Sequence, residues 1–258
     1  MSNFLPIFKR EFKSYFNSPI AYVVIALFLL VSGFFFYNIY SFFNYVVFSM
    51  GMQRGAGFME QINTAEMVCR PLYSNVVIVI LLMVPLLTMR LLAEEKKLGT
   101  IEILLTYPVR DIEAVLGKFA ACLAVYCVML AGTLLYPLML SVYSGVEWGP
   151  VLSCYLGLLL VGSAFISTGL LVSSLTENQI IAGVGTFAVL LLFWLLGASE
   201  RLVSPELGAI LKHLSLLEHF EQFAKGIIDT RDILYYLNFT FIALFLTLRS
   251  LDSGKWRG

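Results

Sequence analysis

The sequence contains six long stretches without a charged residue, and these stretches limit the folds open to the chain. They cover residues 14–53, 71–89, 119–146, 148–176, 178–199 and 233–248. A helix needs roughly 20 mostly apolar residues to cross a bilayer, because lipid offers no partner to a backbone amide. The composition agrees: 59% of the residues are hydrophobic and 13% are charged, whereas soluble domains average about 25% charged. The sequence predicts an all-α integral membrane protein.

The expected organisation is one transmembrane domain that covers residues 1–258. Six spans are expected, at 20–40, 75–92, 119–142, 152–175, 180–196 and 233–248. The last of them is short and is expected to begin at Asp232. Residues 1–18 are expected to form an interfacial helix, 93–118 a charged inner segment and 197–232 an outer helical lid. If both termini are cytoplasmic, the inner segments hold 11 Lys and Arg residues and the outer segments hold 6, as the positive-inside rule requires.

The amino-terminal segment has the pattern of an amphipathic helix that lies in the membrane surface. One face would hold the aromatic residues Phe4, Phe8, Phe12 and Phe16. The other face would hold the basic residues Lys9, Arg10 and Lys13. Asn17, Ser18 and Pro19 would then turn the chain into the first span. Two alternatives remain. The segment could be a basic flank that only orients the first span, or a cleaved signal peptide, although the uncharged stretch is too long for the apolar core of a signal peptide.

The segment between the second and third spans concentrates charge in a chain that otherwise spaces its charges widely. Gly99 interrupts the second span and Thr100 can cap a new helix, while Pro108 stops it. Asp111 and Glu113 then suit the start of the helix that becomes the third span. These signals predict two joined helices, and the alternative is a solvated connector.

The same segment resembles a known family. The run EEKKLGTIEILLTYP over residues 94–108, followed by Gly117-Lys118, is similar to the cytoplasmic segment of type-2 ABC (ABC-2) exporter permeases. Residues 219–229, which lead into the last span, are similar to the corresponding segment of that family. The resemblance is strongest to small six-span members of the gliding-motility and copper-maturation type.

The resemblance implies a permease subunit that pairs with a second permease, identical or different, and with a separate ABC ATPase in two copies. ATP and Mg would bind to that partner, with no cofactor in this chain. The residues implied to contact the ATPase are Glu94, Glu95, Gly99, Thr100, Ile101, Glu102, Leu104, Leu105 and Pro108. The implied location is a bacterial inner membrane with the permease in contact with lipid, and no nucleic acid is expected as a partner.

Catalytic chemistry is not expected in this chain. It contains no G-x-x-x-x-G-K-(S/T), H-E-x-x-H or G-x-S-x-G motif, so neither a phosphate cradle nor a metal or serine hydrolase site is indicated. The four cysteines lack metal-ligand spacing and suit packing. The alternatives are an ion-coupled secondary transporter, which would need a charged group inside a span, and a non-transporting membrane scaffold.

The outer segment begins with helix-start signals at Ser204 and Pro205. An apolar stripe follows, and Ser215 and Gly226 would begin and end a second short helix. We expect these two helices to form a lid through Leu207, Ile210, Leu211 and Leu214. Small residues spaced four apart in the fourth and fifth spans indicate close helix packing. The substrate is not indicated by the sequence.

Overall fold

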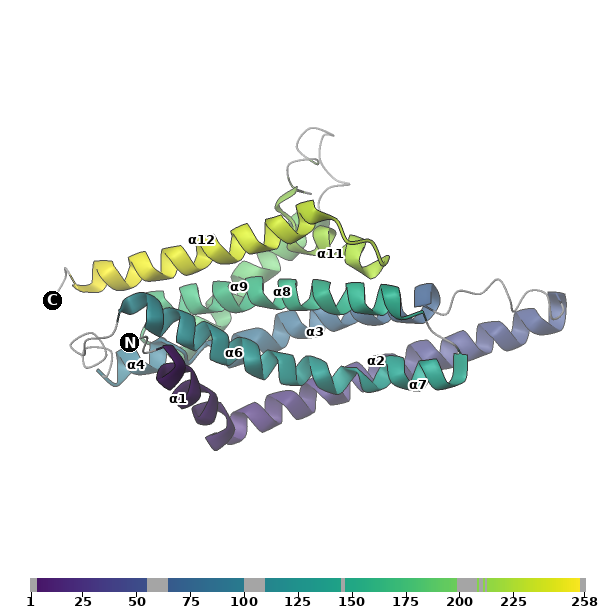
Figure 1. Cartoon of the computed structure of the whole chain (residues 1–258), viewed down its shortest axis with the longest axis horizontal. Helices are drawn as coiled ribbons and strands as arrows, with labels where there is room; N and C mark the ends of the chain where they lie inside the picture. Colours follow the sequence, from purple (N-terminus) through teal and green to yellow (C-terminus); the bar gives the residue numbers. More distant parts are fainter. Residues whose placement is uncertain are drawn as a thin grey trace.

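The computed structural model describes residues 4–54, 65–99, 110–144, 147–198, 208, 211 and 213–255, and in these ranges it is a bundle of helices without a strand (Figure 1). This confirms the all-α prediction. The helices are α1 (Phe4–Asn17), α2 (Pro19–Arg54), the π-helix η2 (Ala65–Cys69), α3 (Arg70–Thr88), α4 (Ala93–Lys97), α6 (Asp111–Thr133), α7 (Leu135–Ser144), α8 (Trp148–Leu175), α9 (Gln179–Ala198), α11 (Leu216–Ala224) and α12 (Thr230–Lys255).

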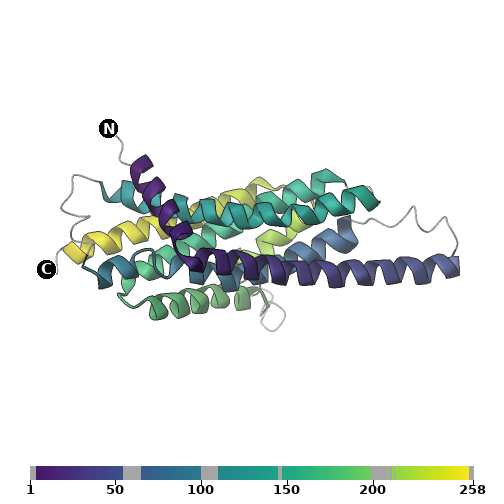
Figure 2. The ribbon, with the colours of Figure 1, turned by 90° about the horizontal axis from the view of Figure 1, so that it is seen from below.

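Within the described residues, six helical segments are long and apolar enough to cross a membrane, so the chain is an integral membrane protein. They are Pro19–Ser49, Met67–Lys97, Asp111–Val142, Trp148–Leu175, Gln179–Gly197 and Thr230–Ser253. The spans run roughly side by side, and both chain termini and α4 lie at one end of the bundle, hereafter the terminus end (Figures 1 and 2). The opposite end is called the far end.

The first span is much longer than expected. α2 continues to Arg54 instead of ending near residue 40, and its 36 residues correspond to about 54 Å at 1.5 Å per residue, against roughly 30 Å of hydrocarbon. Figure 2 shows it extending well past the other helices at the far end. The uncharged stretch contains no proline after Pro19, so nothing in the sequence stops the helix.

The third span is divided in two by a proline. α6 begins at Asp111 and ends at Thr133, and α7 follows after Leu134. Pro137 has no N–H to give to the carbonyl of Thr133, and its ring crowds that carbonyl, so the helix breaks four residues before it. Asp111 was expected as the cap, but Arg110 holds that position and Asp111 and Glu113 lie in the first turn.

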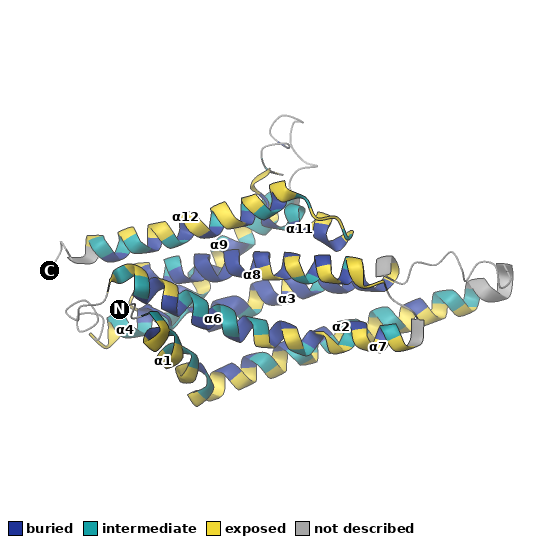
Figure 3. Cartoon of the chain, viewed as in Figure 1, coloured by how far each residue is buried: buried dark blue, intermediate teal, exposed yellow. Residues whose placement is uncertain are grey.

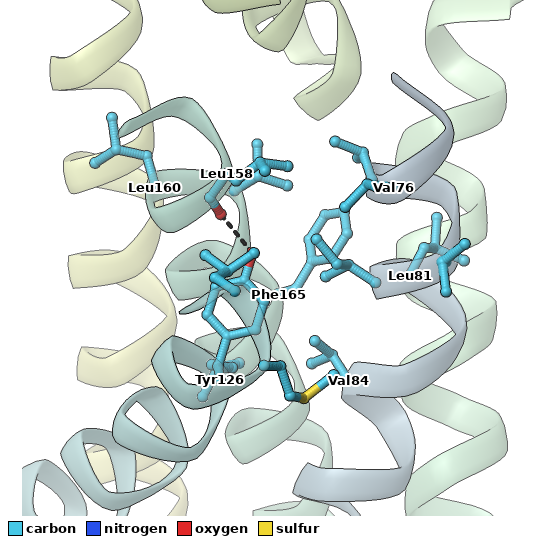
Figure 4. Close-up of a cluster of buried hydrophobic side chains, with 14 of the residues drawn as sticks. Val76, Leu81, Val84, Tyr126, Leu158, Leu160 and Phe165 are labelled. Atoms are coloured by element: carbon cyan, nitrogen blue, oxygen red, sulfur yellow. Dashed lines mark hydrogen bonds between the residues drawn. The ribbon is translucent and has the colours of Figure 1, made fainter. Parts of the chain in front are cut away.

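α8 is the central helix of the bundle. Most of its side chains are buried, whereas α2, α9 and α12 bury far fewer of theirs (Figure 3). Small residues allow this: a Cβ at Gly162 would lie 2.2 Å from the Tyr126 ring, and one at Gly169 would lie 2.1 Å from Thr88 Oγ1. Tyr126 also donates to the carbonyl of Leu158 at 2.7 Å (Figure 4). The predicted close packing of the small residues is confirmed.

The amino-terminal helix α1 lies across the direction of the spans at the terminus end (Figures 1 and 2). It ends at Asn17, and Ser18 makes the corner: its N–H donates to Tyr15 O at 3.3 Å, and its Oγ accepts from the N–H of Ile20 at 3.4 Å. Pro19 then occupies the first position of α2, where its missing N–H is not needed. The predicted helix break at residues 17–19 is confirmed.

At the far end, the second short helix of the predicted lid is present as α11. Ser215 caps it by accepting from the N–H of Glu218. Gly226, at φ +82°, closes it: its N–H donates to Phe223 O, and Ile227 N–H donates to Gln222 O, which is the Schellman pattern.

Of the four apolar residues assigned to the lid, Leu207 and Ile210 lie outside the described residues. Leu211 is partly buried and Leu214 is 46% exposed. α11 is fastened to the start of α12, where His219 Nδ1 lies 2.6 Å from Asp232 Oδ1 and the imidazole stacks on Tyr235 at 3.9 Å.

Candidate functional site

The structure describes only the two flanks of the charged segment that the sequence singles out. Glu94, Glu95 and Gly99 lie at the terminus end, in or just after α4. The rest of the predicted contact residues lie outside the described part of the chain, namely Thr100, Ile101, Glu102, Leu104, Leu105 and Pro108. The candidate site therefore consists of the helices that lie directly before and after this segment.

α4 is a single short helix that ends at a glycine. Its acidic residues, Glu94 and Glu95, occupy the first turn and its basic residues, Lys96 and Lys97, the last. Both placements suit the helix dipole. Gly99 follows at φ +68°, a conformation that a side chain makes costly. Gly99 thus breaks the helix, as predicted, although α3 already ends at Thr88.

Four charged side chains from three helices form a compact ion cluster beside α4, consisting of Arg10, Glu11, Glu95 and Lys118. Lys118 Nζ lies 2.8 Å from Glu95 Oε1 and 3.2 Å from Glu11 Oε1. Arg10 Nη2 lies 2.7 Å from Glu11 Oε1 and 3.4 Å from Glu95 Oε1. The Lys118 side chain is only 1% exposed. Glu95 and Lys118 therefore join the two flanks of the charged segment at its base.

The electrostatics of the cluster follow from this burial. Burial acts to raise the pKa of Glu11, but the nearby charge of Lys118 and the hydrogen bond from Arg10 outweigh it, and the pKa is lowered from 4.5. The hydrogen bond to Glu11 likewise raises the pKa of Arg10 against the effect of burial. Two cations and two anions balance, so the cluster holds a buried lysine without a net charge.

The other side of α4 is fastened to the central helix. Ser173 Oγ accepts from the N–H groups of Leu92 and Ala93 at 3.1 and 3.0 Å and donates to Met89 O at 3.2 Å. Lys96 Nζ donates to Ser174 O. These bonds satisfy backbone groups that the ends of α3, α4 and α8 would leave unpaired, and Lys96 also suits the negative end of the α8 dipole.

Glu95 and Lys96 are adjacent in sequence, but their side chains bind to different helices. Glu95 points to α1 and α6, and Lys96 points to α8. Glu94 makes a third attachment within its own segment, because Arg90 Nε lies 3.3 Å from Glu94 Oε2. Arg90 Nη1 also donates to Ser18 Oγ at 3.0 Å. α4 is thus held on two sides before the chain enters the charged segment.

The amino-terminal helix α1 has three faces where the sequence predicted two. The four phenylalanines form a ladder, with ring centroids 6.3, 5.9 and 4.9 Å apart in chain order. Lys9, Arg10 and Lys13 are exposed on another side. The third face, formed by Ile7, Glu11 and Tyr15, packs on the bundle.

Sequence analysis did not identify Glu11, Tyr15, Lys118 or Ser173 as site residues. Two signals were available: a carboxylate lies among the apolar residues of an amphipathic helix, and a lysine lies a full two turns into the helix of the third span. Ser173 gives no signal of its own, since it resembles the other small residues of α8.

The described residues contain no group of three or more His, Cys, Asp or Glu side chains that could hold a metal ion. The four cysteines are free thiols, and three of them are buried. Comparison with known proteins then decides the family. The sequence profile described as ABC-2 family transporter protein matches residues 5–251.

The chain belongs to the ABC-2 transporter family. A comparison with curated protein sequences gave no significant match. Membership makes this chain an ABC-type permease, a membrane transport component that is not itself catalytic. The match covers nearly the whole chain, so α1, the six spans and the ion cluster all belong to the region that the family shares.

Proposed function

We propose that this ABC-2 permease is the transmembrane subunit of an ATP-driven exporter, coupled to a separate ATPase through residues 99–108. Two permease chains, identical or different, would face each other, and each would rest this segment on one ATPase that binds ATP and Mg. The observation that carries the proposal is the ion pair between Glu95 and Lys118, which joins the flanks of the segment at its base.

The attachments of α4 would allow it to transmit force from an ATPase to the membrane-spanning helices. Glu95 connects the segment to α1 and α6, and Lys96 connects it to the central helix α8. A push on residues 99–108 would therefore reach both groups of helices, whereas a loosely attached connector would absorb it. The acidic and basic residues of α4 would also offer polar contacts to a protein partner next to the membrane.

The buried charges argue against an ion-coupled carrier. Among the residues that the structure describes, Lys118 and Asp232 are the buried charged side chains. Lys118 lies about two turns into α6 and pairs with Glu95, and Asp232 lies in the first turn of α12, beside His219. Ion-coupled transport needs a titratable or coordinating group well inside the membrane, whereas both residues lie toward the ends of their spans.

The orientation and the lid are parts of the same proposal. The terminus end would face the cytoplasm of a bacterial inner membrane, where Lys9, Arg10 and Lys13 would meet anionic headgroups and the phenylalanine ladder would enter the lipid. The segment 197–232 would close the far end of a path between two subunits. If deletion of residues 207–214 left export and ATPase stimulation unchanged, the lid would be discarded.

The coupling role is tested by Ile103→Pro. The sequence predicts a short helix around Ile103, and proline inside such a helix would cost about 3 kcal/mol or more, so this variant should insert and fold but no longer stimulate the ATPase that co-purifies with the permease. Ile103→Ala, which preserves helix propensity, is the matched control and should retain stimulation. Failure to recover any ATPase carrying a Walker motif with the permease would count against the whole proposal.

A further inference from the structure

α1 is attached to the flank that precedes the charged segment. Tyr15 donates its phenolic hydrogen to Leu87 O at 2.9 Å, in the last turn of α3. Arg90 reaches Ser18 Oγ at the corner that ends α1. Both contacts join residues 72 positions apart in the chain. The end of the second span is thereby tied to the interfacial helix at two points.

α1 is attached equally closely to the flank that follows the segment. Gly117 lets the two helices approach, because a Cβ there would lie 2.7 Å from Ile7 Cγ2. One position later, Lys118 bonds to Glu11. Lys118 also bonds to Glu95 of the preceding flank, so a single buried ammonium group holds α1 and both flanks together.

The packing of α1 shows which part of the molecule it belongs to. α1 makes far more extensive contact with α6 than with α2, the helix that follows it in the chain. The corner at Ser18 and Pro19 separates α1 from α2. α1 therefore packs more extensively on the flanks of the charged segment than on α2, its neighbour in the chain.

We propose that Glu11 is a positioning residue for coupling, which holds Lys118, and through it both flanks of the segment, in register with α1. This inference rests on the proposed coupling function and adds a residue to it. When the segment moves with the ATPase, α1 moves with it, turning about the corner at Ser18. A membrane anchor alone would need neither the ion-paired Glu11 carboxylate nor the close approach at Gly117.

The test uses the permease purified with its ATPase in lipid nanodiscs. Glu11→Gln removes one anion from the cluster and leaves the Lys118–Glu95 pair in place. We expect permease-dependent stimulation of ATP hydrolysis to fall by at least about fivefold, the lower range of ordinary coupling effects, in complexes with unchanged subunit stoichiometry. Glu177→Gln, an exposed carboxylate at the same end of the bundle, should retain full stimulation.

An engineered disulfide between α1 and α6 can distinguish a coupling role of Glu11 from a purely structural one. Cβ atoms at positions 7 and 117 would lie 3.2 Å apart, close to disulfide geometry. Ile7→Cys with Gly117→Cys, added to Glu11→Gln, should cross-link on oxidation and restore stimulation, and reduction should remove it again. Absence of the cross-link would contradict the packing of α1 on α6.

Two further results would overturn the proposal: full stimulation by Glu11→Gln, or a cross-linked triple variant that stays uncoupled. If Glu11→Gln does not yield folded complex, Glu11→Asp takes its place, since it retains the charge and withdraws the carboxylate by one methylene. It should show an intermediate loss. Wild-type permease that binds no ATPase would instead refute the coupling function itself, which keeps the two failures distinguishable.

Discussion

Ile7 of α1 occupies the space that a side chain at position 117 of α6 would need, with 2.7 Å between its Cγ2 and a Cβ placed on Gly117. The contact explains one residue of the Gly117-Lys118 pair that is similar to a family motif, and the bond from Lys118 to Glu11 explains the other. Both residues of the pair serve to hold α1 against the third span.

Gly117→Ala should therefore lower the stability of the permease. Overpacking of this kind costs about 1–3 kcal/mol, and Ile7 is β-branched and has little freedom to move aside. Thermal unfolding in detergent measures the effect. Gly149→Ala is the control, because a Cβ at this position of α8 meets no atom within 4 Å. Adding Ile7→Ala should recover most of the loss, and equal midpoints for both glycine variants would refute the close contact.

The contribution of Glu11 should depend on pH in a defined direction. Its pKa in the folded state lies below the ordinary value of 4.5, so the stability that it contributes is complete above about pH 4.5 and is lost as the pH falls through the folded-state pKa. The difference in unfolding free energy between wild type and Glu11→Gln should be constant from pH 7 to 5 and shrink below that. A difference that grows on acidification would show that the sign is wrong.

Ser173→Ala should destabilise the turn between α3 and α4. Two backbone N–H groups, of Leu92 and Ala93, would lose their acceptor, at about 1–3 kcal/mol for each buried group left unpaired. Ser167→Ala is the matched control, since Ser167 is equally buried in α8 but bonds only to Ala164 O of its own helix. Faster hydrogen exchange at Leu92 and Ala93 in Ser173→Ala alone would support the assignment, and equal exchange in both variants would contradict it.

Gly226→Ala should loosen the end of α11. Its φ of +82° costs a residue with a side chain roughly 1–2 kcal/mol, and a Cβ there would also lie 3.1 Å from Pro150 Cβ. Limited proteolysis between α11 and α12 should become faster. Gly149→Ala again serves as the control, and unchanged proteolysis in Gly226→Ala would argue against the Schellman ending.

The six spans could be predicted from the sequence because charge and length in a bilayer admit few arrangements. Ser215 and Gly226 predicted the bounds of α11 correctly, since caps act through neighbouring backbone groups. The predicted end of α2 was wrong because hydropathy does not indicate where a helix ends when the stretch contains no helix-breaking residue.

The ion cluster could not be predicted in the same way. Glu11, Glu95 and Lys118 meet through contacts between three helices far apart in the chain, and periodicity within one helix contains no information about such a meeting. Lys118 therefore counted only as a basic residue flanking a span, although the fold buries it.

The enclosure of α8 determines which helices are free to move during transport. Tyr126, Thr88 and Phe223 lie against its glycines at distances that leave no room for a methyl group, so sliding or rotating α8 would collide with three neighbouring helices at once. We expect α3, α6 and α8 to move together as one rigid body when residues 99–108 are displaced. The broad apolar sides of α2, α9 and α12 face outward and supply the surfaces that can slide.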